Sequence, residues 1–433
     1  MKRVFESRLL LYFAAFLGAI TVTYLFFPGF MSKDSFEQFT EAQSFHFTDW
    51  HPPMMAFVWH FIDLIWPGQQ GMLLFNNLLF WLGMAFILDS RSSRKELSLL
   101  FLFVIGFFPP VIALLSTIWK DVAMGSDLVL AVGLLSKAST VDECKTKRIL
   151  LCMNFFVLLY AIGVRHNAIT AVLPLCFWMS HITLKNAITS MKKKIAIGSL
   201  IFASLVLFNA IATKTLIDEP SYLPTQWFMA HDLTAISAMT GEKTVPKVFQ
   251  NNKNMTYEDW ISIYQPFRVE KIYNPKNPNR LKMTRNPQEL KILFTAWLSA
   301  LTRHPLLYLR HRIMLGAFQW GFAEEVWYPF QTGIQNNDMG ISTELSSRTK
   351  ITVMILYALR NSLLFRGWFY LLLLTAALFY ILRYRKKNYA GIAVGASGIF
   401  YALSNFFFAT AADFRLIWWT VIASLILVLL ADE

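Results

Sequence analysis

Charged residues are scarce in this chain. Asp, Glu, Lys and Arg make up 15% of its 433 residues, whereas hydrophobic residues make up 55%. A soluble globular domain carries about 25% charged residues, so an ordinary soluble protein is excluded. Several runs instead reach or approach the roughly 20 apolar residues that cross a bilayer. The sequence therefore predicts an all-α polytopic membrane protein.

Cysteine is also scarce, which argues against a disulfide framework. Cys144, Cys152 and Cys176 fall in or beside predicted spans and show no paired spacing, so no zinc site is expected either. The sequence also lacks a Walker loop, a G-x-S-x-G elbow, an HExxH motif and a CxxC pair. Chemistry driven by a soluble nucleotide donor therefore has no support.

Membrane topology accounts for most of the net charge of +13. Basic clusters such as Lys192–Lys194 and Arg385–Lys387 lie in short segments that share one side of the predicted membrane. The short segments on the opposite side carry few cations. The positive-inside rule then places both termini inside, and we expect no nucleic-acid partner.

The hydrophobic runs predict about ten transmembrane helices, at residues 8–28, 71–88, 97–115, 119–136, 148–163, 168–184, 195–214, 367–383, 389–408 and 415–431. This pattern divides the chain into a transmembrane domain (1–214) with an outside loop (29–70), one large outside segment (215–366) and C-terminal transmembrane helices (367–433). The apolar stretches Met54–Trp66 and Ile351–Phe365 are predicted to lie on the outer membrane surface, because counting them as spans would reverse the later topology.

Ionisable and polar residues gather at the outer ends of the predicted spans. Placing charge near lipid is costly, so such residues suggest function. The set comprises Asp34, Asp49, His51, Lys120, Asp121, Arg165, His166, Asn167, Asp413 and Arg415. All of them share the outer face in the predicted topology, and we expect them to converge on one site.

The residue types in this set combine an anion site with a base. Lys120, Arg165 and Arg415 are suited to hold a phosphate at the membrane surface. Asp34 is the best candidate for a general base that takes a proton from an incoming hydroxyl. The phosphate would then be the leaving group, and the cations would stabilise its developing charge.

Six further residues are supporting candidates. Asp49, His51 and Asp121 are candidates for supporting catalysis, and His166, Asn167 and Asp413 for contacting the donor or the acceptor.

Structural roles compete with these functional ones. Asp34 can be the N-cap of a helix through Phe36 to Phe45, and Lys120-Asp121 can be a local ion pair that caps a helix. Arg165 can be an interfacial residue whose charged end reaches water. The turn Trp50-His51-Pro52-Pro53 can simply start the next helix.

The arrangement of these motifs resembles the C-type glycosyltransferase superfamily, whose polytopic enzymes use polyprenyl-phosphate sugars as donors. The resemblance rests on the acidic residue Asp34 just after the first helix, on the turn Trp50-His51-Pro52-Pro53, on the pair Lys120-Asp121 and on the turn Arg165-His166-Asn167. Within that superfamily, the chain is similar to bacterial enzymes that decorate envelope glycans, including phage-type glucosyltransferases that modify O-antigen.

The resemblance implies that Asp34 is the catalytic base and that Lys120, Arg165 and Arg415 bind the lipid phosphate. It further implies a bacterial inner membrane location, a periplasmic active site, an envelope glycan acceptor, and a functional link to a carrier-sugar synthase and a flippase. The acidic residues that follow Asp34 are Glu37, Glu41 and Asp49, and their spacing does not favour a metal-binding pair. We expect metal-independent transfer without a cofactor, with a divalent metal left open.

Two other functions remain open at this point. Catalysis by an O-antigen polymerase or ligase would depend on arginines and a histidine at the outer face rather than on Asp34. A lipid or glycan transporter would show inverted repeats and charge near the bilayer midplane, whereas here the candidate charges cluster at one face and no pair of matching halves is visible. Aromatic residues of the outside segment suit stacking on sugar rings, interfacial anchoring or a core role: Tyr222, Trp227, Trp260, Tyr264, Trp320, Trp327 and Tyr328.

Overall fold

The computed structural model describes residues 2–91, 95–184, 190–219 and 223–433. Tyr222 lies outside the described residues. The described chain is mainly α-helical, which confirms the predicted fold class. Its one two-stranded sheet pairs β1 (Phe47–Thr48) in parallel with β2 (Ile217–Glu219).

The α-helices are α1 (Lys2–Leu25), α2 (Lys33–Ser44), α3 (Met54–Ile65), α4 (Gln70–Ser90), α5 (Ser98–Gly106), α6 (Pro109–Leu115), α7 (Lys120–Thr140), α8 (Cys144–Val164), α9 (Ala168–Thr183), α10 (Met191–Leu216), α11 (Leu223–Thr240), α12 (Tyr257–Ile263), α13 (Pro287–Arg303), α14 (Pro305–Gln319), α15 (Ser347–Leu359), α16 (Gly367–Tyr384), α17 (Tyr389–Phe408) and α18 (Trp418–Leu430). Short 3-10 helices are η1 (Lys95–Leu97), η2 (Lys247–Phe249), η3 (Glu270–Tyr273), η4 (Leu363–Phe365) and η5 (Phe414–Ile417).

Seven helices among the described residues are long and apolar enough to cross a membrane: α1, α4, α7, α8, α10, α16 and α17. The predicted span 97–115 is broken into α5 and α6, which are bent by 61° where Pro109 and Pro110 interrupt the run. The predicted spans 168–184 and 415–431 form the shorter apolar helices α9 and η5–α18. Helix length and composition among the described residues therefore support a multi-pass protein with seven or eight spans rather than ten.

Helix α7 lies at the centre of the bundle, where it packs against α4, α8, α9 and α18. Its approach to α4 is very close because glycines face each other. A Cβ on Gly83 would lie 2.5 Å from the backbone nitrogen of Leu130, and one on Gly133 would lie 2.5 Å from the carbonyl oxygen of Gly83. Small residues commonly allow such contact between membrane helices. Helix α7 thus forms a rigid base for Lys120 and Asp121 at its N-terminus.

One end of the bundle carries a cluster around the buried carboxylate of Asp89. Asp89 forms ion pairs with Arg8 (3.1 Å) and with Lys137, and Arg91 forms one with Glu433 at 3.4 Å. These contacts bring the start of α1, the ends of α4 and α7 and the end of α18 together. Four of the segments predicted to lie inside thus meet at one end of the bundle.

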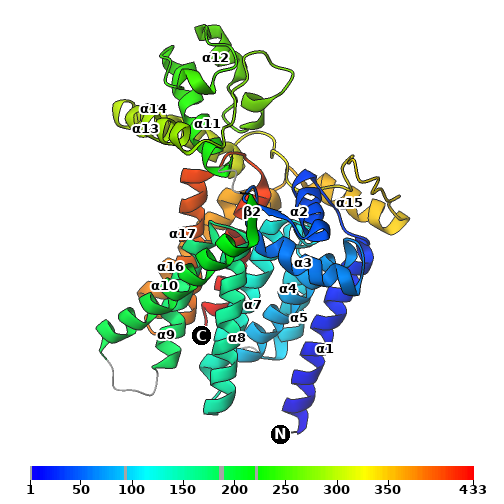
Figure 1. Cartoon of the computed structure of the whole chain (residues 1–433). Helices are drawn as coiled ribbons and strands as arrows, with labels where there is room; N and C mark the ends of the chain where they lie inside the picture. Colours follow the sequence, from blue (N-terminus) through cyan, green and yellow to red (C-terminus); the bar gives the residue numbers. More distant parts are fainter. Residues whose placement is uncertain (1, 92–94, 185–189, 220–222) are drawn as a thin grey trace.

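A lobe of α11–α14 (residues 223–319) covers the opposite end, where α2, α3 and α15 also lie (Figure 1). The lobe has its own core, centred on residues such as Trp260, Ile236 and Leu233. It pairs with the segment 409–412 that follows α17: the Val269 N–H donates to the Thr410 carbonyl (3.1 Å), and the Ala412 N–H donates to the Phe267 carbonyl (3.1 Å). This pairing ties the lobe to the chain just before Asp413 and Arg415.

Candidate functional site

Asp34 lies in the first turn of α2, which starts after the N-cap residue Ser32. The Ser32 N–H donates to the Ser35 hydroxyl (3.1 Å), and the indole N–H of Trp119 donates to the Ser32 hydroxyl (2.7 Å). The N-cap role considered for Asp34 is therefore wrong, because Ser32 fills it. The Asp34 carboxylate is instead available to other groups.

Arg415 is the direct partner of Asp34. Its Nη1 lies 2.7 Å from Asp34 Oδ2, and its Nε lies 3.1 Å from Asp413 Oδ2. Burial raises the pKa of the Asp34 carboxyl, but the charges of Arg415, Lys120 and nearby His51 outweigh burial and hold that pKa below its ordinary value. Burial and the negative charges of Glu270 and Asp34 raise the pKa of Asp413, although Arg415 opposes them. Two carboxylates thus share one guanidinium in different electrostatic surroundings.

Asp121 pairs with Arg165 rather than with its neighbour Lys120. Asp121 Oδ1 lies 2.7 Å from Arg165 Nη1, and Asp121 Oδ2 lies 4.0 Å from Arg415 Nε. The Asp121 side chain is fully buried, and that of Arg165 is 13% exposed. The local Lys120-Asp121 ion pair considered from the sequence is thus not the arrangement found. Arg165 is held inward instead of reaching water as a lone interfacial cation.

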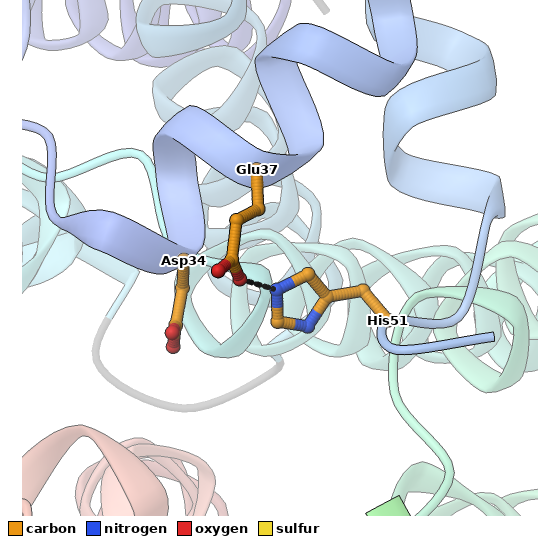
Figure 2. Close-up of side chains that lie close together, drawn as sticks. All are labelled: Asp34, Glu37 and His51. Carbon is orange, nitrogen blue, oxygen red and sulfur yellow. Dashed lines mark hydrogen bonds and ion pairs between the residues drawn. The ribbon is translucent and has the colours of Figure 1, made fainter. Parts of the chain in front are cut away.

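The imidazole of His51 lies between the carboxylate of Glu37 and the amino group of Lys120. Its Nε2 lies 3.0 Å from Glu37 Oε2, and its Nδ1 lies 2.5 Å from Lys120 Nζ. Figure 2 shows Glu37 and Asp34 on the same helix, with Glu37 directed toward His51. The Trp50 indole also donates to Glu37 Oε2 at 2.8 Å. Burial and the neighbouring Lys120 lower the pKa of His51, although Glu37 and Asp34 oppose them.

The turn that carries His51 has a structural role as well, because Pro53 is the N-cap of α3. The structural role predicted for this turn is therefore found, and two of its side chains also contact the candidate site. Pro52 and Pro53 set the start of α3, and the side chains of Trp50 and His51 point to Glu37.

The remaining sequence candidates lie around this network. Burial, Lys120 and Arg165 lower the pKa of His166, and Asp49 lies close enough to oppose them. Asn167 donates from Nδ2 to Asn405 Oδ1 of α17 at 3.1 Å. His166 thus adjoins the cations, whereas the hydrogen bond of Asn167 ties the start of α9 to α17.

One group among the described residues has the geometry to hold a metal ion. Ligand atoms of Asp34, Glu37 and His51 all lie within 4.8 Å of one another, and carboxylates and imidazole are common metal ligands. However, Arg415 already contacts Asp34, and Lys120 already contacts His51. The protein's own cations neutralise this group, which disfavours adding a divalent ion next to them.

Seven of the residues predicted from the sequence meet here: Asp34, His51, Lys120, Asp121, Arg165, Asp413 and Arg415. The parts played by Glu37, Trp119 and Tyr328 were not predicted. Glu37 is three residues after Asp34, a spacing that puts both on one face of a helix. The Trp119 ring lies 4.7 Å from the Arg415 guanidinium and 6.0 Å from the Tyr328 ring. Its position directly before Lys120 was the available signal.

Comparison with known proteins assigns the chain to no family. No protein-family model and no curated protein matches the chain.

Proposed function

We propose that this protein is a membrane glycosyltransferase of the C-type kind. It would move a hexose, with glucose as the first choice, from a polyprenyl-phosphate carrier to an envelope glycan such as O-antigen. One observation carries the proposal: a carboxylate, Asp34, lies within a network that includes Arg415, Arg165 and Lys120 at one end of a bundle of apolar helices. This end of the bundle is where a membrane surface would lie, so the phosphate of a lipid carrier would be within reach of these charged side chains.

The proposed reaction is a displacement at the anomeric carbon. Asp34 takes the proton of the acceptor hydroxyl while the hydroxyl oxygen forms a bond to C1 of the sugar. The bond between C1 and the phosphate oxygen breaks, and its electron pair leaves with the carrier phosphate. The lowered pKa keeps Asp34 ionised at neutral pH, the form that accepts a proton, although it also makes the carboxylate a weaker base.

The cations act on the phosphate. Arg415 offers a planar set of N–H donors that matches phosphate oxygens, and Lys120 offers a compact charge. Both stabilise the negative charge that grows on the leaving group. Asp121 orients the guanidinium group of Arg165 through a contact at 2.7 Å, and Asp413 orients that of Arg415 through a contact at 3.1 Å.

The proposed setting is the bacterial inner membrane. In this arrangement ten segments cross or enter the bilayer, both termini are cytoplasmic, and the α11–α14 lobe is periplasmic and shapes the acceptor side. The donor must then be made by a carrier-sugar synthase and brought across by a flippase. The absence of visible inverted repeats in the sequence and the position of the candidate site charges at one end favour an enzyme over a transporter.

The test is sugar transfer in detergent or membranes, with synthetic polyprenyl-phosphate glucose as donor and native envelope glycan as acceptor. Wild type should transfer, and Asp34→Asn should lose activity by about a hundredfold or more, the scale of a lost general base. Asp338→Asn removes an exposed carboxylate elsewhere and serves as the matched control. A folded Asp34→Asn that keeps pace with wild type would remove Asp34 from the role of base.

A second outcome concerns the reaction class. If wild type transfers no common carrier-linked sugar, a single-sugar transferase is the wrong class, and polymerase or ligase assays become the next step.

A further inference from the structure

Tyr328 has an unusual backbone conformation next to the site. Its φ is +43°, in the left-handed region that an aromatic residue rarely adopts. Residues held in such conformations cluster at active sites and ligand clamps. The Tyr328 carbonyl accepts a hydrogen bond from the N–H of Phe414, the residue between Asp413 and Arg415 (3.4 Å). The conformation thus joins Tyr328 to the segment that carries Arg415.

The Tyr328 side chain lies beside the charged network. Its ring centroid is 6.0 Å from that of Trp119, and the charges of Arg415, Asp413 and Asp34 all act on its hydroxyl. Burial raises the pKa of Tyr328 to about 12, with Arg415 opposing and the two carboxylates adding to the effect. The phenol therefore stays protonated at neutral pH, and its one proton must go to a single acceptor.

Gln331 fixes where that proton goes. The Gln331 amide is buried, and its Nε2 donates to the carbonyls of Gly333 (2.8 Å) and Met31 (3.3 Å). Because both amide protons are used, Oε1 must face the Tyr328 hydroxyl and accept from it. The phenol oxygen then keeps its lone pairs but has no proton left to donate. It is a pure acceptor for a ligand.

The Tyr328 phenol oxygen cannot form a hydrogen bond with an ionised phosphate, because both groups can only accept a hydrogen. The group that matches it is a hydroxyl, and the sugar attached to the phosphate carries several. We propose that Tyr328 accepts a hydrogen bond from one hydroxyl of the transferred sugar and so determines which donor is used. This inference rests on the proposed glycosyl transfer and adds a specificity-determining residue to it.

The experiment compares complete and deoxy donors in wild type and Tyr328→Phe. The variant keeps the ring and removes only the hydroxyl. With polyprenyl-phosphate glucose, kcat/KM should fall about tenfold, the scale of one lost hydrogen bond. Among the 2-, 3-, 4- and 6-deoxy donors, one should be used equally well by wild type and variant, because the hydroxyl that Tyr328 contacts is already missing.

Two controls address folding. Tyr370→Phe, on α16, also removes a hydrogen bond of a buried hydroxyl, to the Leu364 carbonyl of η4 (2.6 Å), and should leave donor preference unchanged. Gln331→Leu frees the Tyr328 hydroxyl to rotate and should reduce discrimination between glucose and that same deoxy donor. This second variant keeps the test available if Tyr328→Phe does not fold.

Three results would overturn the inference. The first is an equal loss with every donor, which means that Tyr328 only positions Arg415. The second is no loss with any donor. The third is the absence of transfer by wild type, which removes the proposed function together with the inference, whereas the first two leave glycosyl transfer intact.

Discussion

Arg415 Nη1 contacts Asp34 Oδ2 at 2.7 Å, although the two residues lie near opposite ends of the chain. The same guanidinium contacts Asp413 and lies over the Trp119 ring. The proposed base and the proposed phosphate ligand are therefore one ion pair. A change in either one alters the chemistry of the other.

Removing Arg415 should change the pH dependence of transfer. Burial raises the pKa of Asp34, and Arg415 is the largest charge that opposes burial. In Arg415→Gln the pKa of Asp34 rises, so Asp34 is protonated, and lost as a base, at higher pH. The acidic limb of a kcat/KM pH profile should move upward, and the KM for the donor should rise.

Arg268→Gln is the control for this effect, because Arg268 is half exposed and pairs with Glu270 beside the network. It should shift the acidic limb much less. An Arg415→Gln profile that superimposes on the wild-type profile would show that Asp34 does not titrate as the base.

The buried pair of Asp121 and Arg165 should be important for stability. Replacing Asp121 by Asn leaves the Arg165 charge in a largely buried position, which costs about 3–5 kcal/mol in comparable cases. Asp121→Asn should therefore lower the unfolding temperature in detergent clearly. The double variant Asp121→Asn with Arg165→Met should recover much of the loss, and failure to recover would mean that Arg165 is not the main partner.

His51 should make stability depend on pH. Burial and Lys120 lower its pKa in the folded protein, whereas the unfolded chain takes up a proton near pH 6.5. The stability that His51 contributes is thus complete above about pH 6.5 and is lost as the pH falls toward the lowered pKa. His51→Gln should show a smaller drop in unfolding temperature between pH 7.5 and pH 5 than wild type does.

His46 provides the comparison for that experiment, because it lies five residues earlier and its side chain is 53% exposed. His46→Gln should retain the wild-type drop between the two pH values. If His51→Gln retains it as well, another buried group is responsible.

Arg312 should connect the lobe to the site. Both Arg312 and Asp232 are fully buried and pair at 2.7 Å, and Arg312 also donates to the Ala409 carbonyl at 2.7 Å. Arg312→Met should destabilise the protein by about 3 kcal/mol because Asp232 is left unpaired, and transfer should weaken. Adding Asp232→Asn should restore most of the stability. Unfolding curves and transfer rates of the two variants check this, and a single variant as stable as wild type would contradict it.

The sequence was sufficient for the helical class and for the charged residues that meet at one end of the bundle. Hydrophobic runs and the cost of charge near lipid are local signals, and they identified Lys120, Arg165 and Arg415. Partner choice was not local: Asp121 pairs with Arg165 across two helices rather than with the adjacent Lys120. The bend between α5 and α6 was missed because hydrophobicity does not register that Pro109 and Pro110 interrupt a run.

Glu37, Asp127 and Tyr328 show further limits of prediction from the sequence. Glu37 appears as one of several acids until α2 turns it toward His51. Asp127, buried in α7 at 1% exposure, also escaped the sequence analysis despite lying inside a predicted span. Tyr328 has a positive φ, and it contacts both Gln331, three residues later, and Phe414, which is distant along the chain. A pattern along the chain does not contain such contacts.

The pairing of Asp34 with Arg415 also sets an order for biosynthesis. A ribosome makes Asp34, His51, Lys120, Asp121 and Arg165 long before it makes Arg415. Asp121 can meet Arg165 once α8 has followed α7, but Asp34 has no guanidinium at 2.7 Å until the segment between α17 and α18 emerges. A nascent chain that stops short of this segment can insert its earlier helices, yet it lacks the last part of the site.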